Sequence, residues 1–595
     1  MLCGFRTPTV SPWLLVSLSL TVACSEGSPQ NQQSGGAPGT GGSLAPTGGA
    51  APNPSGGAQP SGGTDQSQGG SPQSSAGTTQ GGSGGATAGE AGMSQGGTGG
   101  AQGGEAGTPQ GGTGGAQGGE AGTPQGGGGA TGSEGGSGGA VGGSAGSGGS
   151  GGRPPSDCKP NGRARNPLIS HIFTADPNAV VYGDRIYVYT SHDVDGQDDY
   201  KMVDYHVFSS DDMVNWQDHG VIIHANELSW ANYLYAPGAC TKNGKYYLYI
   251  PNEGSSIGVA VADHPGGPFV DPIKKALVTK SFPNANVPWL FDPACFVDDD
   301  GQGYLYFGGG DDGGQNARVV RLNDDMTSIK DSMATTIPTT AFFEASFMHK
   351  HDGKYYFSYS ADFSSGHGAA LEYLIGTSPM SGFEYQGKIL NNGNINNGNN
   401  NHGSIVEFAG KTYLFYHNRK LQQELGVNKV NNRSIAVQEL TYGADGKINT
   451  ISMSTEDYTV SQIKCLDAFE EVEAERFAEE KGIEVDGKAG GVVRVAQIDT
   501  GDWIAYSQVD FRDGATSVVL KVASASGGGQ IEFVIDGCIA GKTGTSVGTC
   551  EVKSTGGANM YAPLTCTITN TSGAHDLCFK FTGNRAFEID SFHLE

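Results

Sequence analysis

The sequence predicts an all-β protein: a five-bladed β-propeller followed by a β-sandwich of the jelly-roll type, both preceded by a disordered Gly/Ser-rich tether. Aromatic runs that follow tight turns recur at a steady spacing through the middle of the chain. Composition changes sharply on either side of this region, which divides the 595 residues into four parts. We expect a signal peptide over 1–24, the tether over 25–160, the propeller over 161–455 and the sandwich over 466–595.

The repeating unit is clearest at 342–360, where FFEASFMHKHDGKYYFSYS reads as a strand, an Asp-Gly turn and a second strand. The pattern recurs four more times, and the units align on five tyrosines that are 52 to 60 residues apart: Tyr187, Tyr247, Tyr304, Tyr356 and Tyr413. Five units of this length, built from short strands and Gly-rich turns, are typical of propeller blades.

Equivalent positions of the repeat point to a candidate site. The residues 11 or 12 positions before the five tyrosines are Asp176, Ala236, Asp292, Glu344 and His402. The first strand of a blade is innermost, so these positions should face a common central channel. One carboxylate there would ordinarily be explained as a turn or strand-end residue. Three converging carboxylates are costly to bury, and they therefore indicate a functional site.

The first 24 residues resemble an export signal. They contain one arginine and an apolar run over 13–22 that is too short to span a bilayer. Small residues before Cys24 resemble a bacterial lipoprotein cleavage site, after which Cys24 would carry the lipid. We therefore expect a secreted or cell-surface protein, either an outer-membrane lipoprotein or a plain secreted protein, that touches a membrane only through such an anchor.

Residues 25–160 consist mainly of Gly, Ser, Ala, Thr, Gln and Pro, and they include the direct repeat TGGAQGGEAGTPQGG at 98–112 and 113–127. This segment has no apolar periodicity that could form a core, so we expect it to be disordered. It either holds the folded part away from a membrane or is an inert spacer.

Charge and cysteine content fit an extracellular protein, which we expect to be a monomer. The formal net charge is −26 and only 16% of the residues are charged, which disfavours nucleic acid and anionic membranes as partners. Eight of the ten cysteines lie beyond the export segment, in an oxidising setting. Cys538, Cys550, Cys566 and Cys578 should form two disulfides, whose connectivity stays open.

The contexts of the channel residues resemble glycoside hydrolase family 43 over nearly all of 165–450. The most specific parts, in this order on the repeat, are Ala-Asp-Pro at 175–177, Phe-Asp-Pro at 291–293, Glu-Ala-Ser at 344–346 and NNHGSIVEF at 400–408. The resemblance implies an inverting hydrolase of arabinose- or xylose-containing plant polysaccharides that uses no organic cofactor.

By position, the resemblance makes Asp176 the general base, Glu344 the general acid, and Asp292 the residue that orients the acid and raises its pKa. Inversion needs an ionised carboxylate to activate water and a protonated one to donate to the leaving oxygen, ~6.5–9.5 Å apart. A third carboxylate nearby disfavours ionisation of the acid. We expect Glu344 to stay protonated near neutral pH and Asp176 to be ionised.

Three further residues are assigned to substrate binding. Arg433 resembles the family's sugar-contacting arginine, with a surface arginine as the alternative. His402 resembles the axial histidine that is often a ligand or near-ligand of a central calcium, and a hydrogen-bonded channel histidine is the alternative. Tyr235 stands where the family often has tryptophan, which predicts a less bulky wall.

The end of the chain resembles a second family. EVEAERF at 471–477 and FEIDSFHLE at 587–595 resemble a family 6 carbohydrate-binding module, over about 466–595. Alternating apolar residues over 530–534 support an antiparallel β-sandwich in this region.

By position, Glu473, Glu475 and Asp590 match the structural calcium ligands of that module, and oxygen ligands suit this cation. Several aromatic platforms of its sugar cleft are replaced, although Tyr561 is retained as an aromatic. The module therefore either binds sugar through another face or is a structural appendage.

These features together predict a glycosidase that removes α-L-arabinofuranosyl or β-xylosyl residues from plant hemicellulose such as arabinoxylan. An endo-arabinanase and a non-catalytic cell-surface carbohydrate-binding propeller are the alternatives. The trio Asp176, Asp292 and Glu344 favours an enzyme, because a binding protein has no need of three carboxylates on one axis, whereas fold alone would not decide. Arabinose versus xylose, and exo versus endo action, depend on loops that the sequence does not define.

Overall fold

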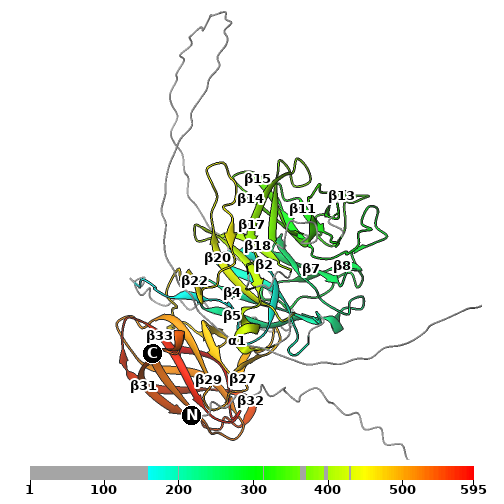
Figure 1. The fold of residues 1–595 in the computed structure, drawn as a ribbon. Coiled ribbons are helices and arrows are strands. Elements are labelled where there is room, and N and C mark those ends of the chain that lie inside the picture. The colour runs from blue at the N-terminus through cyan, green and yellow to red at the C-terminus, as the bar shows by residue number, and fades with distance from the viewer. Residues whose placement is uncertain are drawn as a thin grey trace, which may run out of the picture. The chain divides into compact units, whose positions relative to one another are not determined.

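The computed structural model describes residues 158–595 (Figure 1). It leaves out 198–199, 312–313, 362–369, 394, 396–399 and 428–430 within that range. The predicted signal peptide, Cys24 and nearly all of the predicted tether lie outside the described residues. The regular secondary structure of the described part is almost entirely β-strand, with short helices at α1 (Lys420–Leu425), η1 (Ala225–Glu227) and η4 (Ile539–Gly541). None of the helices in this part is long and apolar enough to cross a membrane.

Residues 174–440 form five sheets in succession, each built from antiparallel strands that follow one another in the chain. The first contains β2 (Thr174–Tyr182), β3 (Arg185–His192), β4 (Asp204–Ser210) and β5 (Trp216–His224). The second contains β6 (Gly238–Lys242), β7 (Lys245–Asn252), β8 (Ser256–Ala262) and β9 (Val278–Thr279). The third contains β10 (Ala294–Val297), β11 (Gly303–Phe307), β12 (Arg318–Arg321) and β13 (Thr335–Thr336).

The fourth sheet contains β14 (Phe342–His351), β15 (Lys354–Ala361), β16 (Ala370–Gly376) and β17 (Glu384–Asn391), to which β21 (Ile451–Ser452) adds in parallel. The fifth contains β18 (Gly403–Phe408), β19 (Lys411–Asn418) and β20 (Ser434–Leu440). The turn between β14 and β15 shows why the hairpins form where the sequence predicts. Asp352 and Gly353 have φ of 47° and 73°, the left-handed conformation that a two-residue Asp-Gly hairpin turn requires.

The five sheets close on themselves. Their first strands contact one another in the cycle β2, β6, β10, β14, β18 and back to β2. Hydrophobic side chains fill the space between neighbouring sheets, and the first and last sheets are joined by Val188, Phe208, Phe415 and Val437. All five tyrosines on which the repeat was aligned are buried in these layers. The first strands, and the residues just before them, therefore meet in the middle of the ring.

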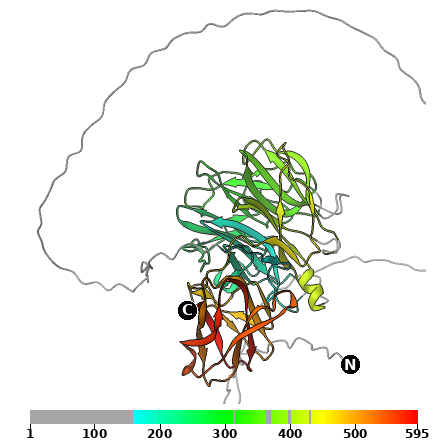
Figure 2. The same cartoon turned by 90° about the vertical axis from the view of Figure 1, so that its left-hand side faces the viewer.

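The C-terminal region is a β-sandwich, seen in orange and red in Figure 2. One sheet contains β26 (Glu484–Asp486), β27 (Arg494–Ala496), β34 (Glu588–Leu594), β29 (Ala515–Ser524) and β32 (Gly557–Thr571), and β23 (Val472–Glu473) pairs with β34. The other contains β25 (Glu479–Lys481), β28 (Trp503–Asp510), β33 (Ala574–Thr582), β30 (Gln530–Gly537) and β31 (Thr543–Glu551). Their inner faces share one core, which includes Tyr506, Leu520, Phe533 and Phe592.

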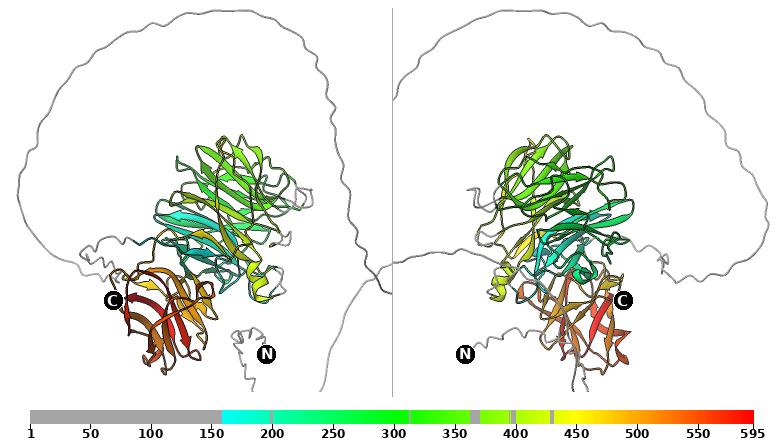
Figure 3. Two further views of the ribbon diagram at one scale, coloured as in Figure 1. Left: turned by 60° about the vertical axis from the view of Figure 1, so that its left-hand side comes forward. Right: turned by 90° about the vertical axis from the view of Figure 1, so that its right-hand side faces the viewer.

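Backbone pairing joins the sandwich to the first sheet. Strand β24 (Arg476–Phe477) adds to the edge of β5, and Figure 3 shows the cyan strands beside the orange ones from both sides. Ser507 donates its backbone N–H to Asn215 Oδ1 at 2.8 Å, and Asn215 Nδ2 donates to the carbonyl of Ser507 at 3.0 Å. The start of the described chain is fixed by another strand pair, between β1 (Arg163–Arg165) and β22 (Tyr458–Ser461).

The described residues contain four disulfides. Cys538 pairs with Cys578 and Cys550 pairs with Cys566, which confirms the two predicted disulfides of the sandwich and supplies their connectivity. Cys240 pairs with Cys295 and links β6 to β10. Cys158 pairs with Cys465 and links the start of the described chain to the segment ahead of the sandwich.

Candidate active site

The structure brings the predicted channel residues together. Asp176 lies in β2, Glu344 lies in β14, and Asp292 lies just before β10. All three line one cavity of about 420 Å³, as does Ala236. His402 Nδ1 lies 3.7 Å from Asp176 Oδ1 and 3.8 Å from Asp292 Oδ2. Residues at equivalent positions of the sequence repeat thus lie close together in the structure.

Irregular backbone aims these carboxylates. Asp176 and Asp292 have positive φ angles of 52° and 47°. Ala345, which follows Glu344, has a φ of 64°. The register of β2 against β3 shifts across Asp176, and that of β14 against β15 shifts on both sides of Glu344. Bulges of this kind redirect side chains, and non-glycine residues with positive φ concentrate at functional sites.

Asp176 is held as an ion. Its Oδ1 accepts a hydrogen bond from Arg433 Nη1 at 2.6 Å, and its Oδ2 accepts one from Ser191 Oγ at 2.6 Å. Burial raises the pKa of Asp176, but the Arg433 cation and the hydrogen bond with His417 outweigh burial, so the pKa lies well below its usual range. An ionised carboxylate facing the cavity can accept a proton from water.

Arg433 is itself fixed by a second carboxylate. It is only 2% exposed, which excludes the alternative of a surface arginine. Asp193 Oδ2 accepts from both the backbone N–H and Nε of Arg433 at 2.9 Å, and Oδ1 accepts from Nη2 at 2.8 Å. The ring of Tyr200 lies 5.2 Å from the guanidinium carbon. The guanidinium lines the cavity, and two aspartates set its orientation; sugar contact by Arg433 stays a prediction.

The pKa of Glu344 is shifted in the opposite direction from that of Asp176. Burial and the negative charge of Asp176 raise its pKa to about 7, against a donated hydrogen bond from Asn400 Nδ2 to Oε1 at 3.2 Å. After burial, the charge of Asp176 raises the pKa of Glu344 most. Burial, Glu344 and Asp176 raise the pKa of Asp292 well above its usual range, so Glu344 and Asp292 interact, and the expected effect of Asp292 on the acid stays a prediction. Both carboxyl groups hold their protons more tightly than free ones, beside an ionised Asp176.

Asp292 also has a structural contact with the acid. Its Oδ2 accepts the backbone N–H of Ala345 at 2.8 Å, which fixes the bulge that carries Glu344. His402 is neutral at pH 7, because burial lowers its pKa to about 4 although Asp176 opposes the shift. His402 therefore brings no charge to the cluster.

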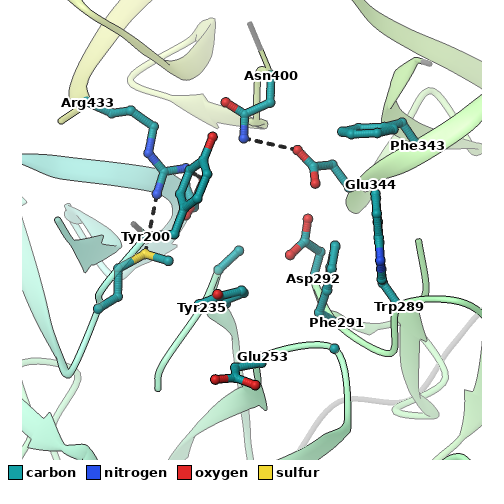
Figure 4. Close-up of a pocket in the computed structure, with 14 residues that line it drawn as sticks. Tyr200, Tyr235, Glu253, Trp289, Phe291, Asp292, Phe343, Glu344, Asn400 and Arg433 are labelled. Carbon is teal, nitrogen blue, oxygen red and sulfur yellow. Dashed lines mark hydrogen bonds and ion pairs between the residues drawn. The ribbon is translucent and has the colours of Figure 1, made fainter. Parts of the chain in front are cut away.

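Aromatic side chains form a wall that the sequence did not single out. The rings of Trp289 and Phe291 are stacked with centroids 5.4 Å apart, and Phe343 meets Trp289 edge-on at 5.2 Å. Figure 4 shows Phe343, Trp289 and Glu344 on one side of the cavity and Arg433 with Tyr200 on the other. Tyr235 lines the cavity as expected. Aromatic faces of this kind suit the apolar faces of sugar rings.

Asn400, Tyr200 and Glu253 also line the cavity and were not predicted. Asn400 lies near the end of an Asn-rich run at 391–401. The available signal was its position, since it lies two residues before His402. Tyr200 and Glu253 lie in loops after strands, where sequence gives no means of telling a wall residue from a surface residue.

The predicted calcium ligands of the sandwich also converge. Glu473, Glu475 and Asp590 line a second cavity of about 480 Å³. Burial and the charge of Asp590 raise the pKa of Glu473 to about 7, and burial with the charge of Glu473 raises that of Glu475 well above its usual range. The buried Oε2 of Glu475 has no hydrogen-bond partner among the described residues. Oxygen ligands that are buried, mutually repelling and unsatisfied fit a hard divalent cation.

Tyr561 lies elsewhere on the sandwich. It lines a cavity of about 230 Å³ together with Leu520 and Pro563. Its hydroxyl donates to Glu588 Oε2 at 3.1 Å. An exposed edge of an aromatic ring beside apolar side chains could meet a sugar, and that role stays a prediction.

A closed ring of sheets that presents an ionised and a protonated carboxylate in one aromatic-walled cavity defines the class of glycoside hydrolases. Comparison with known proteins gives the family. The model of glycosyl hydrolases family 43 matches residues 164–448, and that of carbohydrate binding module family 6 matches residues 473–595.

Curated relatives match both parts together. An arabinoxylan arabinofuranohydrolase of Bacillus subtilis (strain 168) is 38% identical over 479 residues, which cover 72% of this chain and 91% of the relative. One of Paenibacillus polymyxa is 37% identical over 464 residues, which cover 70% of this chain and 72% of the relative. This chain belongs to glycoside hydrolase family 43 and carries a family 6 carbohydrate-binding module, which confirms both resemblances seen in the sequence.

A solved structure agrees with this assignment. The family 43 arabinoxylan arabinofuranohydrolase from Bacillus subtilis, in complex with cellotetraose, superimposes with a TM-score of 0.66 at 37% identity. The match covers 72% of this chain and 97% of that one.

Proposed function

We propose that this enzyme is an inverting pentosidase that removes α-L-arabinofuranosyl or β-xylosyl residues from arabinoxylan or its fragments. The names of its relatives support arabinoxylan as the substrate and arabinofuranosyl as the first choice of leaving sugar. The observation that carries the proposal is the pair of opposed pKa shifts in one cavity. Asp176 is below its usual range, and Glu344 is raised to about 7.

In this mechanism Asp176 accepts a proton from a water molecule as that water attacks the anomeric carbon. Glu344 donates its proton to the glycosidic oxygen of the leaving group. Asp176 then releases its proton to solvent and Glu344 takes up a proton from solvent, which restores the enzyme. Arg433 keeps Asp176 ionised, and Asp292 and Asn400 position Glu344 through the contacts at Ala345 N and Glu344 Oε1.

The architecture that supports this site is a five-bladed propeller with one blade for each of the five sheets. The closed cycle of contacts among the first strands supports this assignment. So does the alternation of sheet and hydrophobic layer around the ring. The three carboxylates come from the first, third and fourth blades.

Calcium is proposed for the sandwich and not for the channel. Glu473, Glu475 and Asp590 would hold the ion, which would neutralise their mutual repulsion. The groups around His402 fit it poorly, because Asp176 is already bound by a cation and Asp292 accepts a backbone N–H. We therefore interpret His402 as a neutral channel histidine and not as a calcium ligand; its Nδ1 lies 3.7 and 3.8 Å from the nearest carboxylate oxygens, beyond hydrogen-bond distance. No step of the reaction involves a channel calcium.

We also propose that the enzyme works outside the cytoplasm. Four disulfides support this location, since such bonds persist in oxidising compartments. Attachment through a lipid on Cys24 remains part of this proposal, and incorporation of radiolabelled palmitate into the protein in cells, lost in Cys24→Ala, would test it.

The test of the activity is a release assay on three substrates: aryl α-L-arabinofuranoside, aryl β-xyloside and linear arabinan. Wild type and Asp176→Ala are compared, and the anomer first released is read by NMR. Release from one aryl pentoside as the inverted anomer, abolished in the variant, is the expected result. Release of oligosaccharides from arabinan would indicate the endo-arabinanase instead. Equal activity of both proteins would remove Asp176 as the base, and no release from any of the three would favour the non-catalytic alternative.

A further inference from the structure

A second group of titratable side chains lies on the first sheet, outside the catalytic cavity. His192 is the last residue of β3, and Asp204 and His206 lie at the start of β4. The two strands pair with Ser191 opposite Tyr205 and Thr190 opposite His206. Alternation along the strands therefore puts His192, Asp204 and His206 on one face. The candidate ligand atoms of these three residues all lie within 4.8 Å of one another.

Each imidazole is already oriented by a carboxylate. His192 Nδ1 lies 2.8 Å from Asp204 Oδ1, and His206 Nδ1 lies 3.0 Å from Asp218 Oδ1. The two rings differ in which nitrogen can face the ion. His206 donates through Nδ1 to Asp218 and leaves Nε2 for the ion, as metal-binding histidines commonly do. His192 Nδ1 faces Asp204, so an ion bound by these two residues would take the place of the proton between them.

The cluster is enclosed but can be reached from solvent. The side chains of His192, Asp204 and His206 are 19%, 13% and 8% exposed. Asp204 and Asp218 place two carboxylate charges beside the imidazoles. A bound divalent ion would balance them, and the partial exposure provides the entry path that metal binding needs.

We propose that His192, Asp204 and His206 bind one divalent transition-metal ion of the zinc class. Two imidazoles and a carboxylate are the donors that zinc and its neighbours prefer, whereas calcium prefers oxygen alone. This site is distinct from the catalytic cavity and from the acidic cluster of the sandwich, and it does not depend on the identity of the sugar substrate.

The place of the site on β3 gives the ion a structural role. Ser191 and Asp193 flank His192, and they point to the other face, where Ser191 bonds Asp176 and Asp193 clamps Arg433. An ion at His192 fixes the end of the strand from which both contacts are made. The ion touches no substrate, so its effect on catalysis is through position.

The experiment uses the full chain, stripped with chelator and dialysed against ZnCl2 in buffer that contains excess CaCl2. Calcium saturates sites made only of oxygen ligands, so zinc retained after dialysis reports the imidazole site. We expect one zinc per chain in wild type and none in His192→Gln or His206→Gln. His351→Gln is the matched control, because His351 also has a carboxylate partner, with Nδ1 2.7 Å from Glu407 Oε1, on another sheet. Glu473→Gln controls for the sandwich, and both controls should retain the zinc.

Thermal unfolding gives a second readout, in which each protein is compared with itself with and without zinc, so a lower stability of a variant does not affect the comparison. A metal that binds the folded state raises Tm as its concentration rises. Wild type should show this rise with ZnCl2, and His206→Gln should melt at the same temperature with and without it. Cobalt(II) in place of zinc should give a visible ligand-field spectrum in wild type that is lost in His192→Gln.

Two results would overturn the proposal. One is a wild-type chain that binds no zinc after dialysis and shows no zinc-dependent rise in Tm. The other is full zinc retention by both histidine variants. Either would mean that the cluster consists of hydrogen-bonded His–Asp pairs only.

Discussion

Two clusters of three carboxylates lie in this chain, and their surroundings make them different in kind. In the cavity of the propeller, Arg433 bonds to Asp176 and keeps the pKa of Asp176 below its usual range, so Asp176 is ionised. The pKa of Glu344, in the same cavity, is raised to about 7. In the sandwich the pKa values of Glu473 and Glu475 are both raised. Lys521 contacts Asp590 at 2.5 Å, but its side chain is 50% exposed and well hydrated.

The difference shows what an internal cation does to a carboxylate cluster. A buried guanidinium on one member produces a base and, through the charge of that base, an acid beside it. In the sandwich, where the neighbouring cation Lys521 is half exposed, Glu473 and Glu475 both resist ionisation, and we propose that their cluster takes a cation from solution. Residue type alone does not separate the two cases, since each is made of Asp and Glu.

The largest effect should come from Asp176→Asn, which removes the base while keeping the shape of the side chain. We expect kcat to fall by about 10²–10⁴-fold, the usual contribution of general base catalysis, with little change in KM. The measurement is steady-state kinetics on the aryl pentoside that the wild type cleaves. Asp184→Asn, an exposed carboxylate on the same hairpin, should have no effect. A variant within a few-fold of wild type would show that another group is the base.

Glu344→Gln tests the acid. Glu344 must be protonated to act, and its pKa is about 7, so wild-type kcat/KM should decline as pH rises through about 7. The variant should be slower, by about 10²-fold or more on substrates with poor leaving groups, and it should lose this alkaline limb. The pH–rate profile of Glu384→Gln, an exposed residue of β17, should match wild type. An unchanged limb in Glu344→Gln would assign it to another group.

Replacing Arg433 should make the pKa of Asp176 rise, as the pKa values of Glu473 and Glu475 do in the sandwich. In Arg433→Met, combined with Asp193→Asn so that Asp193 is not left as an unpaired charge, burial of Asp176 is opposed only by the weaker effects of His417 and His402, and its pKa should rise. Asp176 must be ionised to act, so the acidic limb of the pH–rate profile should move to higher pH and kcat at neutral pH should fall. The comparison fails if the double variant keeps the acidic limb of wild type. Asp193→Asn alone serves as the control for the second substitution.

The sandwich should respond to calcium in a pH-dependent way. The folded-state pKa of Glu473 is raised from 4.5 to about 7, so its contribution to stability is complete below pH 4.5 and is lost as pH rises through about 7. In chelator, Tm of the full chain should therefore decrease over this window. Calcium at a hundredfold excess over its Kd should restore about 2.7 kcal/mol above it.

Glu475→Gln is the matched variant for that experiment, because it keeps the shape of the side chain but removes a ligand charge. Its response of Tm to CaCl2 should be much weaker than that of wild type. Calorimetry that finds equal calcium responses in both proteins would contradict the assignment of this cluster as a calcium site.

Sequence was sufficient to predict that the three carboxylates of the candidate site lie together, because each stands at nearly the same number of residues before an aligned tyrosine. Asp176, Asp292 and Glu344 follow from that offset, and their convergence is what the structure shows. It was also sufficient to expect two disulfides among four nearby cysteines. Pairing could not be read, because the separations along the chain allow more than one connectivity.

Partners that come from different blades were beyond sequence reasoning. Asp193 and Arg433 are 240 residues apart, and nothing local to either predicts their contact. Trp289 and Phe343 look like core residues, since aromatic side chains fill every layer of the ring, and only closure of the ring shows that they face the cavity.

The disulfide between Cys158 and Cys465 has a mechanical consequence. It joins the point where the chain enters the described part to the segment that leads into the sandwich. A force applied upstream of Cys158 and resisted by a carbohydrate held on the sandwich would pass through this covalent bridge. The 306 residues between the two cysteines are bypassed, so tension on an anchored enzyme would leave the geometry of its catalytic ring undisturbed.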